Sequence, residues 1–239
     1  MNHRFGSAWT RRLALASALL AINAWFAPPA QAQAGPTAAE AAQYQGLHAA
    51  AWRGDVTKIE RLVAAGANLN ARDAHGRTPL HLATFARQRG AVRALAKAGA
   101  DLNLLENDRY DGVTIAAVAD DEETLSVLLS LGASAKQVTS RYDGTALIAA
   151  AHLGHDGVVR QLIAAGAPLD HVNNLHWTAV IEAIVLGNGG PRHQATLKAL
   201  LDAGASVKLT DRQGKTPLEL ARARAYAEMV KMLAAAGAK

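Results

Sequence analysis

The sequence of 239 residues contains no cysteine. Disulfide bonds, metal sites built on thiolates, cysteine nucleophiles and a lipid-modified N-terminal cysteine are therefore excluded. The short motifs of common active sites are also missing, among them G-x-S-x-G, H-E-x-x-H and the phosphate-binding loop. The sequence thus predicts a protein that is not an enzyme and that has no cofactor, catalytic residue or metal site. An enzyme with an unrecognised site is the alternative.

A strong excess of charge of one sign is absent as well. Three of the 25 Lys and Arg residues lie in the first 32 positions, which hold no acidic residue. The rest of the chain therefore contains 22 basic and 20 acidic residues. This near balance gives no electrostatic reason to expect a nucleic-acid or anionic-membrane partner.

The first 32 residues have the pattern of a secretory signal peptide. Arg4, Arg11 and Arg12 precede an apolar run over 13–27, and Ala30-Gln31-Ala32 is an A-x-A cleavage site, with a second possible cut two residues later. The run of about fifteen residues is shorter than the ~20 that a membrane span needs, so no stable membrane insertion is expected after cleavage. We expect export to the periplasm, by the Sec or the twin-arginine route, with secretion from the cell as the alternative.

A repeat fills most of the remaining chain. A Gly-Ala pair preceded by an apolar residue recurs at spacings of 33, 33, 34, 38 and 33 residues, with glycine at positions 66, 99, 132, 166, 204 and 237. Such self-similarity is typical of stacked-repeat proteins. The last copy, 211–238, is the most complete. Thr216, Pro217 and Glu219 form a helix start with a capping box, a break follows near Ala225, and a second amphipathic stripe ends at Gly237.

The second copy identifies the family. After Gly76 it reads Thr-Pro-Leu-His-Leu-Ala over 78–83, and it closes with Gly-Ala-Asp-Leu-Asn over 99–103. The chain resembles the ankyrin-repeat family from about Gln43 to its C-terminus. The resemblance implies an all-α solenoid of about six helix-turn-helix repeats with short β-hairpin loops over 43–239, after a flexible tail and the start of a capping helix over 33–42.

Three units depart from the repeat pattern. The first has no hairpin, and Thr37 with Glu40 predicts a capping helix that runs to about Trp52. The third has Asp111 where the others have threonine, so its first helix is expected to lack the usual cap. The fifth carries an insertion, expected to form a long loop over 187–193 that is either a functional contact or a tolerated surface loop.

Polar residues at repeat positions are interpreted first as structural. His81 matches the family's TPLH histidine and His48 lies one repeat earlier, so both are expected to hydrogen-bond between repeats. The acidic run 120–123 stands at a helix start, where it favours capping over a cation site. His152 and His155 are expected to serve the helix turn rather than to bind a metal as a pair.

The resemblance implies that a protein partner binds the concave face, which the hairpin tips and first helices line. Aromatic and Arg side chains, the types enriched at binding hot spots, recur there. The candidate protein-binding residues are Trp52, His75, Arg77, Phe85, Arg109, Tyr110, Arg141, Tyr142, His152, His176 and Trp177. We expect a monomeric, non-enzymatic interaction module, a periplasmic adaptor, scaffold or protective accessory protein for another exported protein. A secreted effector or toxin-immunity component is the alternative.

Overall fold

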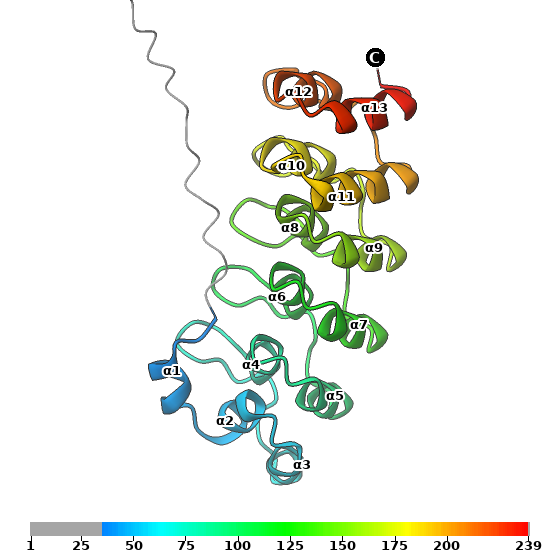
Figure 1. The fold of residues 1–239 in the computed structure, drawn as a ribbon. Coiled ribbons are helices and arrows are strands. Elements are labelled where there is room, and N and C mark those ends of the chain that lie inside the picture. Colours follow the sequence, from blue (N-terminus) through cyan, green and yellow to red (C-terminus); the bar gives the residue numbers. More distant parts are fainter. Residues whose placement is uncertain (1–34, 239) are drawn as a thin grey trace, which may run out of the picture. The chain divides into compact units, whose positions relative to one another are not determined.

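The computed structural model describes residues 35–238, which belong to one compact unit, Gln33–Lys239 (Figure 1). The expected signal peptide, 1–32, lies outside the described residues. The described chain holds thirteen helices and one isolated antiparallel bridge, between Thr139 and Gly144. Among residues 35–238, no helix is both long and apolar enough to cross a membrane.

A short helix, α1 (Ala38–Gln43), precedes six pairs of helices. A turn joins the two helices of each pair. The pairs are α2 (Gly46–Arg53) with α3 (Val56–Ala64), α4 (Pro79–Phe85) with α5 (Arg89–Lys97), α6 (Gly112–Val118) with α7 (Glu122–Ser130), α8 (Ala146–Leu153) with α9 (Asp156–Ala164), α10 (Ala179–Val185) with α11 (Pro191–Asp202), and α12 (Pro217–Ala223) with α13 (Ala227–Ala235). The first helices stack in one row and the second helices in another, and the hairpins project beyond the first-helix row (Figure 1). This is the expected all-α repeat solenoid.

Five of the six helix pairs begin at a side-chain cap, and the first pair, at Gln45, has none. Thr78, Thr145, Thr178 and Thr216 have extended backbone angles, and each hydroxyl accepts a hydrogen bond from the amide three residues later. The expectation that the third unit lacks this cap is wrong, because the Asp111 carboxylate accepts a 2.7 Å bond from the amide of Thr114. Aspartate caps a helix as well as threonine does, so the change leaves the repeat intact.

The core runs along the whole stack because each repeat buries the same two positions. Two residues after the first-helix cap of the second to sixth repeats, an apolar side chain is at most 1% exposed, at Leu80, Val113, Leu147, Val180 and Leu218, and Leu47 of the first repeat is 6% exposed. Four residues before the closing glycine of the second to sixth repeats, a leucine of the second helix is fully buried, at Leu95, Leu128, Leu162, Leu200 and Leu233, whereas Leu62 of the first repeat is partly buried. Burial of one such side chain contributes roughly 1.5–3 kcal/mol, so the docking of neighbouring repeats is mainly hydrophobic.

The closing glycines adopt the left-handed conformation that ends a helix. Their φ angles lie between 78° and 96° at all six positions. A residue with a Cβ atom is disfavoured there, which explains why glycine marks every repeat end. At the turn between the two helices of the second repeat, Arg87 takes the same left-handed conformation with φ 55°. This turn therefore forms without a glycine and is not lengthened.

The structure corrects the expected first helix. The helix that begins at Thr37 ends at Gln43, Tyr44 and Gln45 are extended, and α2 starts afresh at Gly46. The capping box of Thr37 and Glu40 is present. The chain breaks after one and a half turns because Glu40 and Tyr44 turn towards the hairpin of the second repeat, where both find polar partners.

The fifth unit also differs from the expected long loop over 187–193. Only 186–190 lie outside helices, because α11 starts at Pro191 and has 12 residues where the other second helices have nine. Pro191 occupies the first helical position, where its missing amide hydrogen costs nothing. The insertion is therefore taken up largely as an additional turn of helix.

Candidate functional site

Four of the five hairpins are built on one polar side chain at their base, and the hairpin over 139–144 is closed instead by the backbone bridge between Thr139 and Gly144. Asp73 accepts the backbone amides of His75 and Arg77, two and four residues later, at 2.9 and 2.8 Å. Glu106, Asn173 and Asp211 repeat this pattern in the later hairpins. The side chain thereby fixes the turn, so the residues at the tip are held in a defined conformation.

Backbone hydrogen bonds join neighbouring tips into a ladder. The amide of Asn107 donates to the carbonyl of His75 at 3.0 Å, Ser140 donates to Arg109 at 2.9 Å, and Asn174 donates to Tyr142 at 2.9 Å. Four consecutive hairpins are thus linked without the help of side chains. The tips form one rigid surface rather than separate loops.

Two of the candidate arginines pair across this ladder. Arg109 lies 2.8 Å from Asp143 on the next hairpin, and Arg141 lies 3.4 Å from Asp108 on the previous one. The four side chains are 47–64% exposed. Exposed pairs of this kind contribute only ~0–1 kcal/mol, so a carboxylate from another molecule could replace either acid at little cost.

The neighbouring aromatic residues are half-buried. Tyr110 and Tyr142 lie beside the two arginines, and burial raises the pKa of the Tyr110 hydroxyl, so it remains a hydrogen-bond donor at neutral pH. On the next hairpin His176 is exposed, with φ 64°, and Trp177 packs partly against the core. Tyr110, Tyr142 and Trp177 therefore each leave part of the side chain in solvent, and His176 is exposed.

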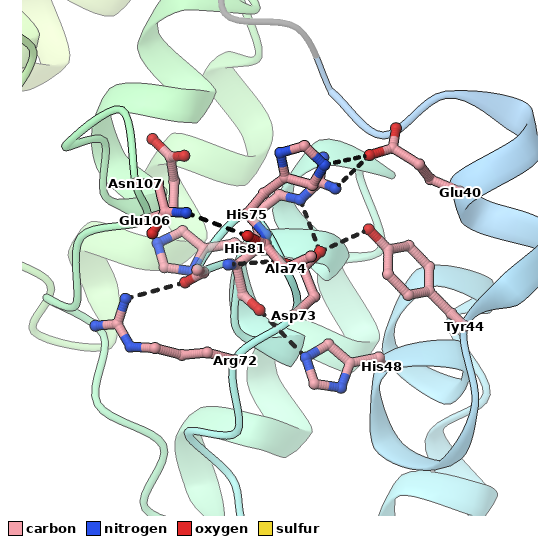
Figure 2. Close-up of polar contacts among 12 residues, drawn as sticks. Glu40, Tyr44, His48, Arg72, Asp73, Ala74, His75, His81, Glu106 and Asn107 are labelled. Atoms are coloured by element: carbon pink, nitrogen blue, oxygen red, sulfur yellow. Dashed lines mark hydrogen bonds and ion pairs between the residues drawn. The ribbon is translucent and has the colours of Figure 1, made fainter.

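The chain's own N-terminal segment meets the first hairpin (Figure 2). The Glu40 carboxylate lies 2.7 Å from Nε2 of His75 and 2.9 Å from the Arg77 guanidinium, and the Tyr44 hydroxyl donates to Asp73 at 2.9 Å. Hydrogen bonds from the Thr37 backbone and side chain, followed by that from Arg77, lower the pKa of Glu40 to about 2. Glu40 therefore stays ionised throughout the physiological range.

Four of the candidate residues lie at this contact with the N-terminal segment. Arg77, a candidate protein-binding residue on the hairpin, is 5% exposed and pairs with both Asp73 and Glu40. His75 is exposed but already engaged by Glu40. Trp52 has its ring 6.5 Å from that of Tyr44, and Phe85 lies under Gly35, where an added Cβ would be 3.0 Å from the phenyl ring.

The candidate residue His152 leads to a buried acid that the sequence analysis missed. Glu182 is 4% exposed, and its Oε2 lies 3.7 Å from Nδ1 of His152 and has no hydrogen bond. Its Oε1 accepts from Asn173 at 2.9 Å. Burial raises the pKa of Glu182 to about 7, whereas burial, together with His193 and His155, lowers that of His152. A neutral His152 cannot compensate the glutamate, and this carboxyl is protonated at mildly acidic pH.

The other histidines have the structural roles that the sequence indicates. His81 accepts the Thr78 amide at Nδ1, and Nε2 therefore carries the hydrogen and donates to the Leu104 carbonyl in the next repeat at 2.9 Å. Burial lowers the pKa of His81 to about 4. His48 bonds to the Arg77 carbonyl at 3.2 Å, and His155 to the Ala117 carbonyl at 2.8 Å. Within 35–238 no cluster of three or more potential ligands could hold a metal ion.

The acidic run caps its helix, as expected. The Asp121 side chain accepts the Thr124 amide at 3.1 Å, and Glu122 and Glu123 occupy the first turn of α7. Asp120 instead binds Arg192, from two repeats later, at 2.8 Å. The lengthened α11 therefore brings a cation to the acidic run rather than leaving it open for a metal.

Comparisons with known proteins agree with this architecture. The family model for ankyrin repeats in three copies matches residues 19–106 and 113–211. The ankyrin repeat protein YahD of Escherichia coli K12 is 39% identical over 190 residues, which are 79% of this chain and 94% of YahD. An ankyrin repeat domain of Acinetobacter baumannii superposes with a TM-score of 0.77 at 44% identity, covering 81% of this chain and 98% of the domain.

A third structure shows the same fold at lower sequence identity. The complex of the predatory endopeptidase Bd0816 from Bdellovibrio bacteriovorus with immunity protein Bd3460 contains a chain with a TM-score of 0.67 and 24% identity, covering 80% of this chain and 98% of its own length. The family model covers more than half of the sequence, and YahD matches it over most of both lengths. The protein belongs to the ankyrin-repeat family.

Proposed function

We propose that this protein is a non-enzymatic periplasmic adaptor that binds another exported protein through its hairpin tips. Ankyrin repeats are in general protein–protein interaction modules. The proposed contact, here named the tip surface, consists of Arg109, Tyr110, Arg141, Tyr142, His176 and Trp177. The single observation that carries the proposal is the backbone ladder, which holds three consecutive hairpins with these side chains in fixed register.

The tip surface has the properties of a preorganised interface. Tyr110 and Tyr142 are half-buried, so little side-chain entropy is lost when a partner covers them. Arg109 and Arg141 are exposed and only weakly held by their acids, so they remain available to a partner carboxylate. Aromatic anchors next to arginines are the usual composition of an energetic hot spot.

The periplasmic location is part of the proposal and is supported by the sequence alone. The A-x-A motif follows a short apolar run and three arginines, which is the order of a cleavable signal peptide. The absence of cysteine means that the protein needs no oxidising enzyme to reach its folded state in that compartment.

Photo-crosslinking in the exporting host tests both parts. A photoreactive phenylalanine derivative is placed at Tyr142, and in a control protein at Arg93, which is exposed on the second-helix row. We expect one protein to be captured from the periplasmic fraction through position 142 and not through position 93. Capture through both positions, or through neither, would contradict the tip surface, and a partner found only outside the cell would favour a secreted effector.

A further inference from the structure

The first repeats have a binding surface that the chain itself occupies. The N-terminal segment, residues 35–45, lies across the hairpin and first helix of the second repeat. Its Glu40 pairs with His75 and Arg77, and four residues later Tyr44 donates to Asp73 (Figure 2). The segment therefore presents two polar side chains to one hairpin, one from α1 and one from the residue that follows it.

The segment is attached weakly compared with the repeats. No residue of α1 is buried, in contrast to the first helices of the other repeats, which bury between four and six residues each. A helix of six residues is too short to be stable in isolation, because nucleation is costly. Its position depends on a few contacts, and the break at Tyr44 and Gln45 separates it from α2. No residue of the segment belongs to the buried core.

The surface beneath the segment continues the tip surface. Arg77 holds the position, just before the helix cap, that Tyr110 and Trp177 hold in later repeats. Its side chain is 6% exposed, and its guanidinium pairs with Glu40 of the segment as well as with Asp73. Phe85 and Trp52 lie on the same side, against Gly35 and Tyr44. The exposed tips of the later repeats and the covered tip of the second are thus equivalent parts of one row.

We propose that these residues, named here the covered cradle (Trp52, Asp73, His75, Arg77 and Phe85), form a peptide-binding subsite whose resident occupant is the N-terminal segment. The ligand is a protein segment with a glutamate followed four residues later by a tyrosine, which replaces Glu40 and Tyr44 at the same partners. The inference rests on the proposed function, since the displacing segment belongs to the bound protein. When the N-terminal segment leaves, the surface that a partner can contact includes the tips of four hairpins rather than three.

A labelled peptide of residues 35–45 tests the subsite without any knowledge of the natural partner. The receptor is the full mature chain carrying Glu40→Lys and Tyr44→Ala, in which charge repulsion from Arg77 and the loss of the Tyr44 hydroxyl release the segment. The control receptor carries Glu60→Lys, a charge reversal on an exposed residue of α3. Fluorescence anisotropy measures peptide binding to both and to the wild type.

We expect the peptide to bind the double variant at least tenfold more tightly than it binds the wild type or Glu60→Lys. In those two proteins the tethered segment competes at an effective concentration on the order of millimolar. A peptide carrying Glu40→Lys should lose at least tenfold in affinity for the double variant. Equal binding to all three receptors, or no binding to a double variant that melts like the wild type, overturns the subsite but leaves the tip surface untouched.

Hydrogen exchange on the wild-type chain keeps the inference testable if the double variant does not fold. The amides of α1 should exchange much faster than those of α4, which shows that the segment opens while the repeats stay closed. Exchange of α1 at the rate of α4 would mean that the segment is a permanent part of the fold, and would overturn its role as a replaceable occupant.

Discussion

Replacement of Glu182 by glutamine should remove a pH-dependent loss of stability. In the folded chain burial raises the pKa of this carboxyl to about 7, against 4.5 for an ordinary glutamate. The unfolded chain therefore ionises first as the pH rises, and unfolding becomes easier between pH 4.5 and 7. The stabilising contribution is fully present below the unfolded pKa and is lost as the pH rises through the folded one.

The difference between the two pKa values sets the size of the effect. One pKa unit corresponds to 1.36 kcal/mol, so the ionised state of the buried group costs about 3 kcal/mol above pH 7. Glutamine has the same shape, stays neutral at every pH and can still accept the Asn173 bond. Its free energy of unfolding should exceed that of the wild type by this amount at pH 8 and match it near pH 4.5.

Urea unfolding of both proteins at half-unit steps from pH 4.5 to 8 measures this difference. The comparison between the two proteins is needed because burial lowers the pKa values of His81 and His152, whose stabilising contributions grow as the pH rises. Both histidines are present in both proteins, so their effect largely cancels. Parallel stability curves over the whole range would refute the interpretation of Glu182 as a buried, uncompensated acid.

Three further experiments test the fold, the tip surface and export. Gly166→Val places a branched residue at φ 78° and should lower the free energy of unfolding by roughly 1–2 kcal/mol; thermal melts that overlay the wild type would contradict the assigned helix end. Once a partner is in hand, a Tyr110→Ala, Tyr142→Ala double variant should bind about thirtyfold more weakly with unchanged circular dichroism, and retained binding would exclude these anchors. Intact-mass analysis from the exporting host should give an N-terminus at Gln33 or Gly35, and a full-length soluble protein would disprove cleavage.

The repeat itself could be predicted from the sequence because its signals are local. Glycine at a left-handed helix end and threonine at a helix start each serve a backbone conformation within a few residues, so their spacing alone defines six units. The left-handed Arg87 shows the limit of such signals. A residue can adopt an unfavourable conformation when the packing on both sides of the turn requires it.

The covered cradle could not be predicted in this way. The residues from Thr37 to Trp52 read as one continuous helix, and Gly46, which has φ 52° at the start of α2, is the local signal of a break that this interpretation passed over. The break depends on contacts of Glu40 with Arg77 and of Tyr44 with Asp73, which lie 37 and 29 residues apart in the chain. Such tertiary contacts override local helix preference, and the sequence alone gives no measure of them.

The sequence does contain a signal that Glu182 is buried, but the signal appears only when the repeats are aligned with one another. Counted from the helix cap, Glu182 takes the place of Leu82, Ile115 and Leu220, which are 0%, 1% and 9% exposed. A charged residue at a position that is apolar in the sister repeats is buried by the same packing. Comparison of equivalent positions therefore predicts buried charge, which periodicity within a single helix does not.

The ladder between hairpins also has a consequence for how the chain folds. Its backbone hydrogen bonds each join residues about one repeat apart, from Asn107 to His75, from Ser140 to Arg109 and from Asn174 to Tyr142. The entropy lost in closing each such loop is therefore nearly constant and does not grow with the number of repeats. Folding by successive addition of repeats to a small nucleus needs no long-range search. Stopped-flow refolding of the mature chain and of a form with one internal repeat added should give rates within a few-fold of each other, whereas a steep slowing with length would show that distant repeats must meet before folding begins.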